Sequence, residues 1–167
     1  MAIASRARSL IFAFALLSAC QPAAPPVDND LRAIGALRER IAAAENAGQA
    51  DSMQALVDSD VVVLPPNAAP MLGATAFVDY LRGAFQSLSF AVEYRSQEVE
   101  VSGDWGFDRG TFSATMSPRA GGPAISDKGN YLWLARRDSA GQWHYARIIW
   151  NAESPPPAPT DSAAKRP

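Results

Sequence analysis

The chain has 167 residues, of which 48% are hydrophobic and 19% are charged, and its formal net charge is −2. A chain of this size can bury a full core as one domain, and its composition excludes global disorder. The weakly negative charge does not indicate a surface that binds nucleic acid. One Cys and one His exclude an intrachain disulfide and the usual Cys/His set of a structural zinc site, and no residue pattern predicts another metal or a cofactor.

The first residues are typical of an export signal. Arg6 and Arg8 precede an apolar run from Leu10 to Ala19, and residues 1–27 contain no Asp or Glu. This run is about ten residues long, whereas a helix that spans a bilayer needs roughly twenty. Residues 1–19 are therefore predicted to be a cleaved signal peptide.

The signal ends in Leu17-Ser18-Ala19-Cys20, which resembles the lipobox of bacterial lipoproteins. The resemblance implies cleavage between Ala19 and Cys20 and lipidation of the Cys20 sulfur, which would anchor the protein in the membrane. Gln21 after the cysteine implies the outer membrane, on the side that faces the periplasm. Ordinary cleavage near Ala19, with Cys20 left as a free thiol, is the alternative.

Composition divides the rest of the chain into three parts. Residues 20–28 hold Cys20 and a Pro/Ala tether, and residues 154–167 form a second Pro-rich stretch, predicted to be disordered. The folded domain is predicted over residues 29–153.

Three helices and one strand are predicted in the first half of this domain. Asp30 can cap an amphipathic helix of about seventeen residues that ends before Gly48. A pattern like a capping box starts a short second helix at Asp51. The β-branched run over residues 61–64 is typical of a buried strand, and Thr75 can cap a third helix whose apolar stripe includes Phe77, Val78, Leu81 and Phe85.

The second half of the domain is predicted to be four antiparallel strands. Phe90, Val92 and Tyr94 share one face, but Val99 and Val101 have the opposite parity, which indicates a bulge between Ser96 and Glu98. A similar change of face is predicted in the next strand, between the pair Trp105 and Phe107 and the set Phe112, Ala114 and Met116. Hairpins are predicted at residues 102–104 and 138–141, and the two changes of face together predict a strongly curved sheet.

This order of elements carries a resemblance to a known family. The segments 102–110, with its Gly-Asp-Trp hairpin, 129–133, 141–143 and 149–151, together with the valine strand and the Pro65-Pro66 loop, resemble the SnoaL-like members of the nuclear transport factor 2-like superfamily, which includes ketosteroid isomerase. The resemblance implies an α+β fold in which a cone-shaped, curved antiparallel sheet wraps around the N-terminal helices and leaves a pocket at its open end.

Side chains from several elements are predicted to line such a pocket: Asn67, Tyr80, Tyr94, Trp105, Arg109, Tyr131, Arg147 and Trp150. Arg109 shares parity with Trp105 and Phe107, which would make it an inward cation for an anionic or carbonyl-bearing ligand. A structural ion pair with Glu93 or Glu98 is the alternative for Arg109.

Acid/base chemistry in the pocket would need a carboxyl or an imidazole. The candidates are Asp60, Asp108, Tyr131 and His144, with Asp79 as a further carboxyl. Relatives often carry an acidic residue where this chain has Ile148, so the last strand supplies no such group. The alternatives are a turn cap or an ion pair with Arg147 for Asp60 and a solvent-facing hairpin position for His144.

The sequence therefore predicts a lipid-anchored envelope protein whose domain binds a small, partly apolar molecule or a protein partner. One alternative is an acid/base enzyme such as an isomerase, cyclase or hydratase. Another is a homodimerisation module with a vestigial pocket. A carboxyl or His with a shifted pKa inside the pocket would favour the enzyme, and a pocket lined only by apolar groups and Arg would favour binding.

Overall fold

The computed structural model describes residues 27–153, so the predicted signal peptide, Cys20 and most of the two Pro-rich ends lie outside the described residues. The helical elements are α1 (Val27–Asn46), the 3-10 helix η1 (Ala50–Ala55) and α2 (Ala74–Ser87). The strands are β1 (Val57–Leu64), β2 (Met71–Leu72), β3 (Leu88–Ser102), β4 (Trp105–Pro118), β5 (Ile125–Arg137) and β6 (Trp143–Ala152). Among the described residues, no helix is long and apolar enough to cross a membrane.

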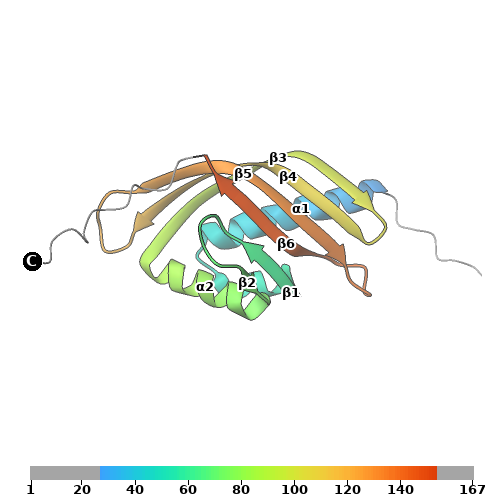
Figure 1. The fold of residues 1–167 in the computed structure, drawn as a ribbon, viewed down its shortest axis with the longest axis horizontal. Helices are drawn as coiled ribbons and strands as arrows, with labels where there is room; N and C mark the ends of the chain where they lie inside the picture. The colour runs from blue at the N-terminus through green and yellow to red at the C-terminus, as the bar shows by residue number, and fades with distance from the viewer. Residues whose placement is uncertain (1–26, 154–167) are drawn as a thin grey trace, which may run out of the picture.

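One curved sheet in the order β2-β1-β6-β5-β4-β3 dominates the fold. It arches over α1 and α2, which lie on its concave face (Figure 1). The predicted α+β architecture is therefore confirmed. Two details are absent from the prediction: β1 pairs with β6 in parallel, and the short strand β2 pairs with Val62 and Val63 of β1.

The first helix buries the predicted stripe, with Ile34, Leu37 and Ile41 at most 2% exposed. Asp30 is not its cap, because α1 begins at Val27 and places Asp30 inside the first turn. The buried Asp30 carboxylate instead accepts hydrogen bonds from Arg137 (2.7 Å) and from Trp143 Nε1 (3.1 Å). These bonds tie the start of α1 to the β5–β6 hairpin.

The starts of the other two helical elements also differ from the prediction. The capping-box pattern at Asp51 belongs to η1, which has no side-chain cap. Thr75 does not cap α2, because the helix begins at Ala74 after Gly73, whose φ of 86° lies in the left-handed region. The strand predicted over residues 61–64 is longer than expected, since β1 starts at Val57.

The bulge predicted in β3 is confirmed, because the register with β4 shifts between Ser96 and Glu98. The change of face predicted in β4 is wrong. Its register with β5 is continuous, and the inner face carries Gly106, Asp108 and Gly110. A Cβ atom at Gly110 would lie 2.0 Å from the Arg95 carbonyl oxygen, so close approach of the bulged strand requires glycine there, and the apolar pair that suggested the change lies outside.

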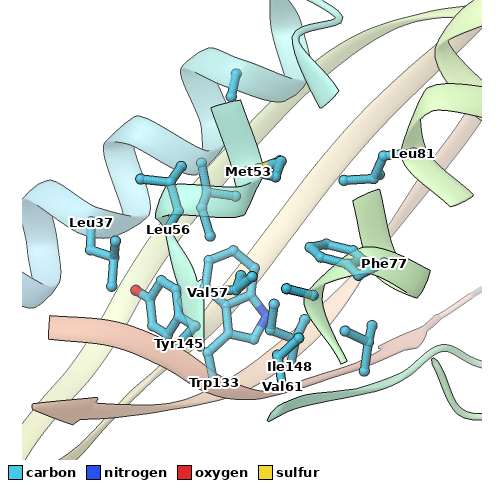
Figure 2. Close-up of a cluster of buried hydrophobic side chains, with 14 of the residues drawn as sticks. Leu37, Met53, Leu56, Val57, Val61, Phe77, Leu81, Trp133, Tyr145 and Ile148 are labelled. Atoms are coloured by element: carbon cyan, nitrogen blue, oxygen red, sulfur yellow. The ribbon is translucent and has the colours of Figure 1, made fainter. Parts of the chain in front are cut away.

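The core lies between the concave face and the helices. Trp133 and Tyr145 from the sheet face Leu37 of α1 and Leu56 after η1, with Val61 of β1 beside them (Figure 2). Neighbouring rings meet edge to face, with 5.0 Å between the ring centres of Trp133 and Tyr145. This packing fills one end of the cone and leaves a cavity toward the other.

Candidate active site

A cavity of about 290 Å³ lies between α1, α2 and the concave face of the sheet. Its volume is at the small end of the range of about 300–1,000 Å³ that ligand pockets occupy. Most of its lining is apolar or aromatic: Ile41, Glu45, Pro65, Pro66, Ala68, Phe77, Tyr80, Leu81, Ala84, Phe90, Val92, Tyr94, Phe112, Ala114, Met116, Asp127, Trp133, Ile148 and Trp150. Among these residues, two are charged and both are acidic.

The first acidic residue is Glu45, near the end of α1. Its Oε2 atom accepts a hydrogen bond of 2.8 Å from the Tyr94 hydroxyl on β3. Burial raises the pKa of Glu45 from 4.5 to about 7, and the hydrogen bond from Tyr94 lowers it in part. Burial, followed by the nearby Glu45 charge, raises the pKa of Tyr94 well above 10, so this hydroxyl keeps its proton. Glu45 can therefore both accept and donate a proton near neutral pH.

Asn46, the next residue, fixes this part of α1 to the same strand. Its Nδ2 atom donates to the Val92 carbonyl (3.0 Å), and its Oδ1 atom accepts from the Val92 backbone N–H (2.6 Å). The amide thus pairs with the edge of β3 as a neighbouring strand would. Because Tyr94 is two residues further along β3, the two bonds also set the position of Glu45 against the Tyr94 hydroxyl.

Trp133 supplies a free donor in the cavity lining. The side chain is 3% exposed, and its buried Nε1 atom has no hydrogen-bond partner within residues 27–153. Figure 2 shows the indole nitrogen on the side of the ring toward Phe77 and Ile148, which also line the cavity. A buried N–H group without an acceptor is rare in folded proteins, so a ligand oxygen in the cavity would satisfy it.

Asp108 belongs to a separate buried network. Its side chain is 0% exposed and accepts hydrogen bonds from Arg38 (2.6 Å), Ser96 (2.7 Å) and the Tyr131 hydroxyl (3.0 Å). Burial, then the Asp108 charge, raises the pKa of Tyr131. Asp108 does point inward, but it and Tyr131 are bound to each other and neither lines the cavity. Their network ties α1 to β3, β4 and β5.

Three predicted pocket residues do line the cavity: Tyr80, Tyr94 and Trp150. Asn67 does not, although Pro66 and Ala68 on either side of it do. It adopts a φ of 56° at the tip of the loop between β1 and β2, so it serves the turn.

Trp105 and Arg109 lie on the outer face of the sheet, contrary to the prediction. Both positions follow from the continuous register between β4 and β5, which keeps odd-numbered residues of β4 on the outer face. Trp105 is 41% exposed and packs under the Arg136 guanidinium, 5.5 Å from its ring centre. Arg109 is exposed and forms an ion pair with Glu98, which is the structural alternative for this residue.

Arg147 also fails to line the cavity, contrary to the prediction, because β6 has its own irregularity. The register with β5 shifts between Leu134, which faces Arg147, and Ala135, which faces Tyr145. The shift leaves Ala146 as an extra residue and turns Ile148 and Trp150 inward. Arg147 Nη1 donates to the Ala146 carbonyl (2.6 Å) and does not line the cavity.

The remaining acid/base candidates lie outside the cavity. Asp60 is exposed and pairs with Arg136 (2.7 Å), rather than with Arg147. His144 lies beside the β5–β6 turn with Nε2 3.2 Å from Asp138 Oδ2, which is the hairpin position of its alternative, but its side chain is half-buried rather than solvent-facing. Asp79 pairs with Arg82 on the surface of α2.

The prediction therefore missed the carboxyl of the cavity. Glu45 is not among the predicted candidates, although it follows Ile41 by four residues and Ala44 by one. The spacing i, i+4 puts it on the margin of the buried stripe, and this is the signal that could have found it. Arg38, four residues after Ile34, carries the same signal and reaches Asp108.

The sheet, the two helices and the cavity define a nuclear transport factor 2-like α+β fold. The family model described as a SnoaL-like domain matches residues 38–143, and the chain belongs to this family. No curated protein matches the chain.

Solved structures show the same fold. A ketosteroid isomerase-like protein from Erwinia carotovora atroseptica is 25% identical with a TM-score of 0.70, over 77% of this chain and 99% of that one. A nuclear transport factor 2-like superfamily protein from Salmonella enterica is 9% identical with a TM-score of 0.71, over 78% and 95%. A hexachlorocyclohexane dehydrochlorinase from Novosphingobium barchaimii is 15% identical with a TM-score of 0.67, over 75% and 88%.

Proposed function

We propose that the cavity is the site of an acid/base enzyme that binds a small, mainly apolar carbonyl compound and moves a proton on it. The observation that carries this proposal is the Glu45 carboxyl, which lines an apolar cavity and has a pKa of about 7. A cavity lined only by apolar groups would favour simple binding. The presence of this carboxyl favours the enzyme alternative instead.

The groups around the cavity suggest how such a step would run. Tyr94 binds Oε2 of Glu45, so the other oxygen can take a proton from the carbon next to the carbonyl of the bound molecule. Electron density then moves to the carbonyl oxygen, where the Trp133 N–H can donate a hydrogen bond to the developing charge. Return of the proton from Glu45 to another carbon completes an isomerisation, and return to the same carbon gives exchange.

Hydrogen exchange tests this step without knowledge of the natural substrate. We expect the full chain in D₂O to accelerate loss of the α-protons of 2-indanone or cyclohexanone above the buffer rate, followed by ¹H NMR. Glu45→Gln should return the rate to that of buffer, and Trp133→Phe should lower it by about 100-fold. Glu39→Gln, at an exposed position of the same helix, is the matched control and should exchange as the wild type does.

Two results would overturn the proposal. One is an exchange rate of Glu45→Gln equal to that of the wild type. The other is a wild-type rate no higher than buffer for both ketones.

We further propose that the enzyme is attached to the bacterial envelope through lipid on Cys20, on the periplasmic side of the outer membrane. The proposal is supported by the lipobox-like Leu17-Ser18-Ala19-Cys20 sequence, which lies outside the described residues. Cys20→Ser should move the protein from the membrane fraction to the soluble fraction. Unchanged membrane association of this variant would contradict the anchor.

A homodimer is proposed from the outer face of the sheet. An apolar patch there spans neighbouring strands and consists of Leu64, Phe107, Leu132, Leu134 and Ile149, which the strand registers place in two adjacent rows. Leu132 is 40% exposed, and a second copy would cover it. Light scattering should show a dimer for the wild type and a monomer for Leu132→Glu, and a wild-type monomer at micromolar concentration would refute the proposal.

A further inference from the structure

Asp127, the second acidic residue of the cavity, has no role in the proton transfer proposed above. It lies near the start of β5, and the strand register places it in a row with Ala114 and Val92 on the concave face. Tyr94, the partner of Glu45, belongs to the adjacent row. The two carboxyls therefore face the same cavity from different elements, one from α1 and one from the sheet.

Asp127 lies where the cavity opens. Ile125, the next residue of β5 on the same face, is 55% exposed. Tyr80, which lines the cavity from α2, is 53% exposed. The carboxylate is thus at the rim, whereas Glu45 is further in.

No basic side chain among the described residues neutralises Asp127. No Lys, Arg or His lines the cavity, and Asp127 forms no ion pair within residues 27–153. Lys128, the nearest basic residue in sequence, points to the opposite face and pairs with Glu153 (3.0 Å). Within residues 27–153 the Asp127 carboxylate accepts one hydrogen bond, from the Lys128 backbone N–H (2.8 Å).

These charges determine which ligands the cavity can accept. A carboxylate or phosphate would lose its hydration beside Asp127 and Glu45 with no cation to replace it, which is strongly unfavourable. A positive group would be attracted by Asp127, and the aromatic side chains of Tyr80 and Trp150, which line the cavity, suit a cation as well. The expected inward cation at Arg109 would have favoured the opposite class of ligand, but Arg109 is outside.

We propose that the molecule bound in this cavity carries a positively charged amine, which Asp127 holds at the rim while the apolar body extends toward Glu45. This inference rests on the proposed function, which assigns the bound molecule a carbonyl group, and it adds that the same molecule carries a positive charge. Asp127 is then a determinant of specificity, and it does not touch the reacting atoms.

Three probes of one shape test the charge class by binding alone. They are 2-aminoindane, which is a cation, 2-indanol, which is neutral, and indane-2-carboxylate, which is an anion. With the full chain at pH 7, titration calorimetry or ligand-observed NMR should give a Kd for the amine at least tenfold lower than for the alcohol. The carboxylate should bind more weakly than the alcohol.

Two variants test whether Asp127 causes the preference for the amine over the alcohol. Asp127→Asn should weaken the amine by about tenfold and leave the alcohol within twofold. Asp79→Asn, which removes one negative charge from the surface of α2, is the matched control and should change neither. Failure of the amine to bind, equal affinities of amine and alcohol for the wild type, or an unchanged preference in Asp127→Asn would each overturn the proposal.

The result is independent of the proton transfer. If amine selectivity is found but Glu45→Gln still exchanges ketone protons, the charge class holds and the proposed catalytic role fails. If exchange depends on Glu45 but the amine has no advantage, the enzyme proposal holds and this inference fails.

Discussion

Replacing Glu45 by Gln isolates the free energy needed to ionise one carboxyl inside the cavity. The amide has nearly the same shape and keeps an oxygen that can accept the Tyr94 hydroxyl proton, but it does not titrate. A comparison of the two proteins across pH therefore cancels the other titrating groups. What remains is the contribution of Glu45 to the free energy of unfolding.

The sign of this contribution follows from the two pKa values. In the unfolded chain Glu45 titrates with its ordinary pKa of 4.5, and in the folded protein its pKa is about 7. Between these values the folded state holds the proton more firmly, so the wild type loses stability relative to Glu45→Gln as the pH rises. The contribution is fully present below pH 4.5 and lost once the pH has passed about 7.

The magnitude is set by the same difference. Each pKa step of one corresponds to about 1.4 kcal/mol, so between pH 4 and pH 8 the wild type should lose up to about 3 kcal/mol relative to the variant. This is an upper value, because the carboxyl faces a cavity that water can enter, and water there screens its charge.

Urea unfolding of both proteins at half-unit steps from pH 4 to pH 8 measures this difference. Tyr94→Phe should move the loss of stability to higher pH, because it removes the hydrogen bond that favours the ionised carboxyl. Parallel stability curves for the wild type and Glu45→Gln over the whole range would refute the reasoning, since they would mean that Glu45 has the same pKa in the folded and unfolded chain.

Three further predictions concern the frame around the site, each measured by chemical denaturation at pH 7. Asp108→Asn should destabilise the fold by about 3 kcal/mol, because it leaves the Arg38 guanidinium of α1 without its buried, charged partner. A loss of stability below about 1 kcal/mol would contradict this prediction. Gly106→Ala should cost about 1–3 kcal/mol, since its Cβ would lie 2.7 Å from the Ile34 side chain, whereas Gly83→Ala in open space on α2 should stabilise by about 0.5–1 kcal/mol. Asn46→Ala should lower the free energy of unfolding by about 2 kcal/mol, because two hydrogen bonds to Val92 of β3 are lost. An unchanged denaturation midpoint would show that the Asn46–Val92 pairing does not stabilise the fold.

The fold could be predicted because its signals are local and redundant. The buried stripe of α1, the bulge between Ser96 and Glu98 and the two hairpins each follow from spacing or turn chemistry. The start of α2 could not be predicted in this way, because Gly73, with φ in the left-handed region, precedes the helix instead of the side-chain cap expected at Thr75.

The site was harder to predict because it depends on side chains that break the apolar pattern. On β4 the buried positions carry glycines and Asp108, while Trp105 and Phe107 are outside, so hydrophobicity indicated the wrong face. On β6 the extra residue Ala146 reverses the alternation of inward and outward side chains for all later residues of the strand. Glu45 is polar, which is typical of a solvated residue, and only its spacing from Ile41 and Ala44 places it on the margin of the buried stripe.

The pairing of Asn46 with Val92 also covers part of a strand edge. β3 is the last strand of the sheet on its side and is fifteen residues long, and an exposed strand edge can template the addition of a strand from another chain. Asn46 occupies both backbone groups of Val92, while Glu93 and Arg95 place charges beside it. An incoming strand could pair with Val92 only by displacing Asn46, so we expect the residue that positions the carboxyl also to hinder the addition of a second copy at this edge.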